Sequence, residues 1–235
     1  MSGVLPVSVG YAAIGGVSVV LGSVLATRRE LSTRTQSLVQ HAAAGTVLAG
    51  LVVDVLAKLL ARPGQLAYTA IGMVLGLAGM LAIRQFAGSE GSGGMGSLVV
   101  TVVTDILVDG VLIGLSVALG SGTGLLFAIA LAPEMGLLGV TAAQSLAQRW
   151  SPGRVLAAAA GIGVAITGAG GLGWLIAQTN AALITGVLGL GASVIIYLIM
   201  EELLREAHEV DTGSTEVAVL FGCFLPFFLA GVAVG

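Results

Sequence analysis

The chain has 235 residues, of which 57% are hydrophobic and only 9% are charged, and its mean hydropathy is +1.07. These polar residues are too few to cover the surface of a water-soluble protein of this size. The composition therefore predicts an integral membrane protein. A net charge of -3 with nine lysines and arginines provides no basic surface for nucleic acid, and the single cysteine, Cys223, excludes an internal disulfide.

The composition also indicates the class of membrane fold. Glycine occurs 37 times and aromatic residues make up only 5% of the chain, which is typical of helices that approach one another through small side chains. A transmembrane barrel would need alternating segments of about ten residues bounded by aromatic girdles, and the sequence has none. We therefore predict an all-α integral membrane protein.

Eight apolar runs are long enough to cross a bilayer, which takes about 20 residues. In chain order they cover residues 4–26, 38–60, 65–86, 97–120, 122–147, 154–178, 180–204 and 214–234. The first run has no positively charged segment before it, so we interpret it as a spanning helix and not as a signal peptide. The connectors are short, and residues 1–235 are predicted to form a single transmembrane domain.

The basic residues predict how the chain is oriented. Seven of the nine lie at alternate connectors, and hence on one side of the membrane: Arg28, Arg29, Arg34, Arg84, Arg149, Arg154 and Arg205. Lys58 and Arg62 lie on the other side. The positive-inside rule assigns the side with seven charges to the cytoplasm, so both termini are predicted to be extracytoplasmic.

Acidic residues inside the predicted spans are the strongest functional signal. Asp105 and Asp109 are four residues apart in the fourth span, so both project from one helix face. Glu134, in the fifth span, lies about as far beyond the intervening hairpin as Asp109 lies before it, and Pro133 beside it is expected to kink the helix and free the carbonyl of Ile129. Because intramembrane acids are costly, we predict that these three carboxylates bind a cation and are protonated when empty; a structural clasp between helices is the alternative.

Further candidate residues lie near the predicted inner face. Four of them lie at or beyond the inner end of the seventh span: Glu201, Glu202, Glu206 and His208. A metal exit path and a solvated charge run are both compatible with this pattern. His41 begins the apolar part of the second span and is more typical of an interfacial histidine than of a metal ligand, although it remains among the candidates. No Ser/His or His/His/acid set lies within the spans, so no enzymatic activity is predicted.

Four segments resemble motifs of the ZIP family of divalent-metal transporters. "HAAAGTVLAGLVVDVLAKLL" (41–60) resembles the second helix of that family, "DILVDG" (105–110) lies at the position of its helix-4 motif, and "ALAPEMG" (130–136) resembles its helix-5 motif. "MEELLREAHE" (200–209) is similar to the end of its helix 7 and is the most specific of the four matches.

The resemblance implies a 3+2+3 bundle in which inverted repeats flank the fourth and fifth helices, with a metal site midway along them. It implies that Asp109 and Glu134 are metal ligands and that Glu201, Glu202, Glu206 and His208 form an acidic inner mouth. It also implies a homodimer. The expected location is the plasma membrane of a prokaryotic cell, and the bilayer is the expected partner besides the metal.

The departures from the family motifs change the expected chemistry. Asp105 replaces a histidine of the helix-4 motif, and Ala130 stands at the histidine position of the helix-5 motif. Carboxylates favour harder cations such as manganese or iron over zinc. We therefore expect uptake of a divalent cation (Zn, Mn, Fe, Co or Cd) toward the cytoplasm, with no permanently bound cofactor. The alternatives are a transport-inactive homologue that acts as a metal sensor or complex subunit, and a proton or organic-cation carrier.

Overall fold

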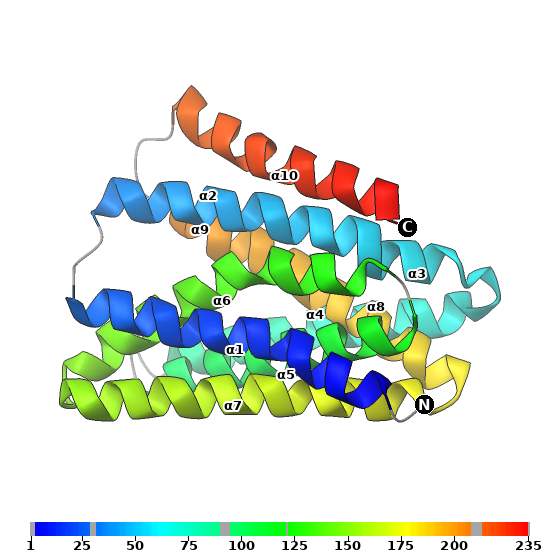
Figure 1. The fold of residues 1–235 in the computed structure, drawn as a ribbon, viewed down its shortest axis with the longest axis horizontal. Coiled ribbons are helices and arrows are strands. Elements are labelled where there is room, and N and C mark those ends of the chain that lie inside the picture. The colour runs from blue at the N-terminus through cyan, green and yellow to red at the C-terminus, as the bar shows by residue number, and fades with distance from the viewer. Residues whose placement is uncertain (1–2, 29–31, 90–94, 121, 208–212, 235) are drawn as a thin grey trace.

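The computed structural model describes residues 3–28, 32–89, 95–120, 122–207 and 213–234, and within them the chain is helical apart from short connectors, with no strand. The helices lie side by side along the long axis of the molecule (Figure 1). The all-α prediction is therefore confirmed. In chain order the elements are α1 (Val4–Arg28), α2 (Thr33–Gly50), η1 (Leu51–Leu56), α3 (Ala57–Leu60), η2 (Pro63–Gln65), α4 (Leu66–Ser89), α5 (Met95–Ala118), α6 (Gly124–Ala147), α7 (Pro152–Ala177), α8 (Ala181–Leu198), η3 (Ile199–Leu203), α9 (Leu204–Ala207) and α10 (Ser214–Val234).

Two of the long helices contain a π-helical segment. η1 continues α2 into α3 without a break, and η3 continues α8 into α9. A π-helical turn carries one more residue than an α-helical turn and occurs frequently at functional sites. Each π-helical segment contains acidic residues, Asp54 in η1 and Glu201 and Glu202 in η3.

Seven of the eight predicted spans correspond to helical runs that qualify as membrane spans. Within the described residues, seven helical runs are long and apolar enough to cross a membrane. α5, the helix that carries Asp105 and Asp109, has 24 residues, the same length as α4 and α6. It occupies the position of the fourth predicted span.

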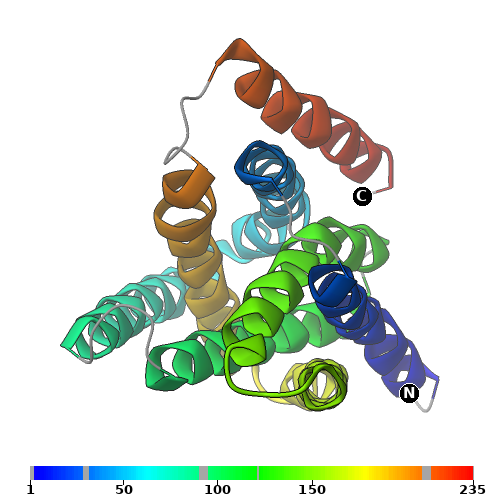
Figure 2. The same cartoon turned by 90° about the vertical axis from the view of Figure 1, so that its left-hand side faces the viewer.

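The helices pack in a few extensive pairs. α1 packs on α6 and α7, α5 packs on α7, α4 packs on α8, and α10 packs on α2. Viewed along the bundle, α4 and α10 lie at the periphery, whereas α5 and α6 lie in the middle (Figure 2). The largest core cluster is built around these central helices and includes the buried side chains of Leu51, Leu112, Phe127, Leu131 and Leu188.

Glycines lie where the helices cross most closely. A Cβ atom placed on Gly22 of α1 would lie 1.9 Å from the carbonyl oxygen of Gly136 in α6, and one on Gly173 of α7 would lie 2.1 Å from the carbonyl oxygen of Val111 in α5. No larger residue fits at such distances, so backbone packs directly against backbone, as expected for small residues at helix interfaces in membranes.

The start of α1 and the end of α10 lie at the same end of the bundle (Figure 1). The connections between α3 and α4 and between α5 and α6 lie at this end as well. The opposite end carries most of the described arginines, namely Arg28, Arg34, Arg84, Arg149, Arg154 and Arg205.

Candidate functional site

Two buried aspartates lie in the middle of α5. Asp105 and Asp109 have 6% and 0% of their surface exposed, and they are one helical turn apart on the same face. Within the part of the chain that the structure describes, neither carboxylate oxygen of Asp109 has a hydrogen-bond partner. A buried carboxylate without hydrogen bonds is costly as an anion, so it needs a bound cation or a proton.

The third predicted acid is buried in the adjacent helix. Glu134 of α6 has 8% of its surface exposed and follows Pro133 within a helix that runs unbroken from Gly124 to Ala147. Among the described residues, however, no three Asp, Glu, His or Cys side chains lie close enough together to hold a metal ion. Asp105, Asp109 and Glu134 are therefore buried on two adjacent helices but do not form a preassembled three-carboxylate cluster.

A hydroxyl from α2 reaches the backbone of α6 near Pro133. The side chain of Thr46 donates a hydrogen bond of 2.8 Å to the carbonyl oxygen of Ala130. The sequence analysis predicted a freed carbonyl at Ile129, and the observed polar contact between the helices lies one residue further on. The side chain of Ile129 is 39% exposed. A hydrogen bond therefore joins α2 to α6 one turn before Glu134.

His41 lies inside the bundle. Only 1% of its surface is exposed, and its Nδ1 lies 2.9 Å from the carbonyl oxygen of Ser37, one turn earlier in α2. His41 is covered because α2 packs against α6 and α10, and its interpretation as a residue at the depth of the membrane interface stays a prediction. Its ring is fixed by this backbone contact.

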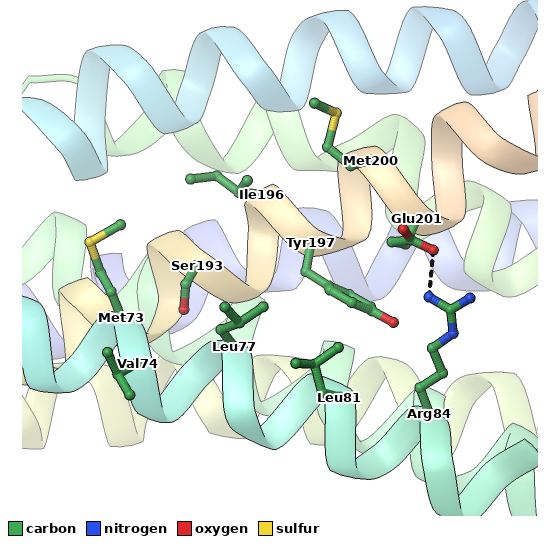
Figure 3. A pocket seen from close by; sticks show the side chains of 10 residues that line it. All are labelled: Met73, Val74, Leu77, Leu81, Arg84, Ser193, Ile196, Tyr197, Met200 and Glu201. Carbon is green, nitrogen blue, oxygen red and sulfur yellow. Dashed lines mark hydrogen bonds and ion pairs between the residues drawn. The ribbon is translucent and has the colours of Figure 1, made fainter.

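At the end of the bundle opposite the termini, Glu201 of η3 forms an ion pair with Arg84 of α4. The distance between Glu201 Oε2 and Arg84 Nη1 is 2.7 Å (Figure 3). The two side chains are 40% and 59% exposed, respectively. The pair borders a peripheral cavity of about 500 Å³ between α4 and α8, whose other lining residues are mainly apolar. Glu201 therefore has a basic partner at this end of the bundle.

Three further residues were predicted to form the inner mouth: Glu202, Glu206 and His208. Glu202 lies in η3 and Glu206 lies in α9. The description of these two residues covers the backbone and not the side chain. His208 lies outside the described residues.

A second polar site, which the sequence analysis did not predict, lies near the end of the bundle that holds both termini. Asp54 of η1 is fully buried and forms an ion pair with Lys58, which is 9% exposed. Ser116 of α5 and Thr123, just before α6, each donate a hydrogen bond of 2.5 Å to the Asp54 carboxylate, and Lys58 Nζ donates one of 2.9 Å to Ser116 Oγ. We call these four residues the Asp54 cluster.

The sequence did contain one signal for this cluster. Asp54 and Lys58 are four residues apart, so their side chains are neighbours on one helix face. The two hydroxyl residues carry no comparable signal, because serine and threonine are common in spanning helices and turns.

No family model and no curated protein matches the chain.

Proposed function

We propose that this chain is a ZIP-like carrier that moves a divalent cation toward the cytoplasm, with Asp105, Asp109 and Glu134 as the residues of its central binding site. The observation that carries the proposal is the state of Asp109, a fully buried carboxylate whose two oxygens have no partner within the described residues. Its neighbour Asp105 adds a second buried acid one turn away. Such residues in a membrane span are expected to serve an ion path.

The available counter-charges support a cation and not an internal salt bridge. Within the described residues, the ion pairs join Lys58 to Asp54 and Arg84 to Glu201, and neither base pairs with Asp109. Carboxylate oxygens suit harder cations, so manganese or iron is the expected class of substrate. The absence of a preassembled ligand cluster is compatible with a carrier whose binding residues come together when the cation arrives.

The packing of the helices supports an inverted-repeat plan. If the first three long helices are exchanged with the last three, and α5 with α6, the α4–α8 pair maps onto the α10–α2 pair. The α1–α6 pair likewise maps onto the α7–α5 pair. The same exchange matches the two helices that contain π-helical segments, η1 and η3. This correspondence is the pattern of a carrier whose site lies at the interface of its repeats.

The distribution of arginines supports an orientation. The end of the bundle opposite the termini carries Arg28, Arg34, Arg84, Arg149, Arg154 and Arg205, so the positive-inside rule assigns that end to the cytoplasm. The Asp54 cluster then lies toward the outside, and Glu201 lies toward the inside. Residence in a prokaryotic plasma membrane and assembly as a homodimer remain expectations from the family resemblance.

The direct test is cation flux into proteoliposomes, measured in parallel for manganese, iron, cobalt, zinc, cadmium and magnesium. We expect the combined change Asp109→Asn and Glu134→Gln to reduce flux of the most permeant ion at least tenfold, because both changes remove a negative charge from the site. Thr104→Val is the matched control, since Thr104 lies next to Asp105 on α5 but is only partly buried and bonds to its own helix at the carbonyl of Val100. Unchanged flux of every ion in the double variant would contradict the proposal.

A proton carrier is the second candidate, and one observation favours it. Because no three ligand side chains are gathered among the described residues, Asp109 in the observed arrangement is as well suited to a proton as to a metal. The two functions are separated by the thermal stability of the detergent-solubilised protein. A divalent cation that binds the native state must raise its melting temperature, and this rise should disappear when Asp109 and Glu134 are changed. Proton flux with no effect of any divalent cation would favour the proton carrier.

A further inference from the structure

The Asp54 cluster is a buried, charged group that is separate from Asp105, Asp109 and Glu134, which we call the central acids. Asp54 has 0%, Ser116 0%, Thr123 3% and Lys58 9% of their surfaces exposed. These residues come from three parts of the chain, namely the η1–α3 segment, the outer part of α5 and the turn before α6. The cluster therefore ties the second long helix to both helices that carry the central acids.

Ser116, the member of the cluster on α5, projects from the same face of this helix as Asp109. Ser116 follows Asp109 by seven residues, which is nearly two turns, so the two side chains project in directions that differ by only about 20° and lie about 10 Å apart along the helix. A cation that enters from the outer end and moves along this face of α5 would meet the cluster before it reaches Asp109.

The hydrogen bonds of the cluster occupy the polar atoms that such a cation would meet. One oxygen of Asp54 accepts from Thr123, the other accepts from Ser116, and Lys58 bonds to both Asp54 and Ser116. The Lys58 ammonium thus occupies Oδ1 of Asp54 and the Ser116 hydroxyl, and the Ser116 hydroxyl occupies Oδ2. The ion pair leaves Asp54 with no net negative charge to attract a cation, while the bonds to α5 and to the start of α6 hold these helices against the η1–α3 segment.

We infer that the Asp54 cluster is the outer gate of the cation path, and that Lys58 keeps the gate closed by occupying the position on Asp54 and Ser116 that a passing cation would take. This inference rests on the proposed function for its cargo, whereas its test does not require transport. The π-helical turn around Asp54 supports it, because such turns provide a local change in helix geometry at functional positions. Opening requires Lys58 to leave Asp54 and requires the two hydroxyls to release the carboxylate.

The experiment measures access to the path from outside. A single reporter thiol is placed by Ile113→Cys in a Cys223→Ser background, because Ile113 is fully buried and lies on α5 between Asp109 and Ser116. A charged, membrane-impermeant methanethiosulfonate reagent is applied to right-side-out and to inverted membrane vesicles. The gate is opened by the combined change Asp54→Asn and Lys58→Gln, which removes both charges together and leaves neither one buried without its partner.

We expect the labelling rate from right-side-out vesicles to rise at least tenfold in the double variant, and the reversed pair Asp54→Lys with Lys58→Asp to restore protection. Thr123→Val, a milder change, should give a smaller rise in the same direction. Thr179→Val is the matched control, because Thr179 lies at the same end of the bundle but is exposed and bonds only to the carbonyl of Ile176. It should leave labelling unchanged.

Two results would overturn the inference. One is an unchanged labelling rate from right-side-out vesicles in both the double variant and Thr123→Val. The other is a sign that the whole bundle has loosened. That sign is either an equal rise of the labelling rate in both vesicle orientations or faster labelling of the native Cys223 in a chain without the reporter. The central site is tested separately, because Asp109→Asn with Glu134→Gln should reduce flux at least tenfold and leave the reporter protected. If labelling does not rise but cation flux is normal, the outer gate is refuted and the proposed function stands. If labelling rises but no cation is transported, the gate stands and the proposed cation cargo is refuted.

Discussion

Replacing Asp54 by Asn should lower the free energy of unfolding by about 3–5 kcal/mol, the usual cost of breaking a buried ion pair by removing one partner. The change leaves the ammonium of Lys58 buried beside a neutral amide. Lys58→Gln should cost less, because the Asp54 carboxylate still accepts hydrogen bonds from Ser116 and Thr123, each at 2.5 Å. Unfolding of the detergent-solubilised protein by heat or by denaturant measures both values.

The combined variant Asp54→Asn and Lys58→Gln decides whether the two residues act together. Its loss of stability should be smaller than the sum of the single losses by about 2–3 kcal/mol, the coupling expected of residues in one network. The ion pair between Arg84 and Glu201 is the natural comparison, because its side chains are 59% and 40% exposed. Glu201→Gln should cost about 0–1 kcal/mol. Additive losses at Asp54 and Lys58 would show that the pair contributes no more than an exposed one.

The overall fold is largely readable from hydropathy, for a physical reason. The predicted spans 122–147 and 214–234 agree with Gly124–Ala147 and Ser214–Val234 to within two residues. In a bilayer, each crossing segment must satisfy its own backbone hydrogen bonds and be apolar over its length, so one signal sets both its type and its extent. The π-helical segments η1 and η3 leave no such signal, because they change the helical turn and not the polarity of the run.

The polar sites were only partly predictable. Burial of Asp105, Asp109 and Glu134 follows from their position within apolar runs, and the structure places all three inside the bundle. Counting residues from a hairpin gives depth but not the lateral direction of each side chain. For that reason the sequence could not show whether the three carboxylates converge on one point. Lateral placement depends on how each helix is rotated against its neighbours, which packing decides.

The Asp54 cluster shows a second limit of the sequence. Asp54 and Lys58 are adjacent on one helix, but their partners Ser116 and Thr123 come from more than 50 residues further along the chain. Their hydroxyls are small enough to pass as ordinary residues of a spanning helix and a turn. Tertiary packing alone brings them to the carboxylate.

Gly173→Ala should destabilise the bundle by about 1–3 kcal/mol or more, the cost of adding atoms to a well-packed interface. The new methyl group would lie 2.1 Å from the carbonyl oxygen of Val111 and 2.5 Å from the backbone nitrogen of Leu115, so α5 itself must move. Because Val111 is two residues from Asp109, this shift should also reduce cation flux.

Gly168→Ala, on the same helix, is the matched control for this prediction. A Cβ atom there has nothing within 4 Å, so the change should be neutral or should stabilise the helix by up to about 1 kcal/mol through the higher helix propensity of alanine. Melting temperature and flux, measured for both variants in one preparation, separate the cost of contact from the gain in propensity. Equal behaviour of the two variants would mean that α5 and α7 are not in backbone contact at Gly173. In that case the position of Asp109 would not depend on this crossing.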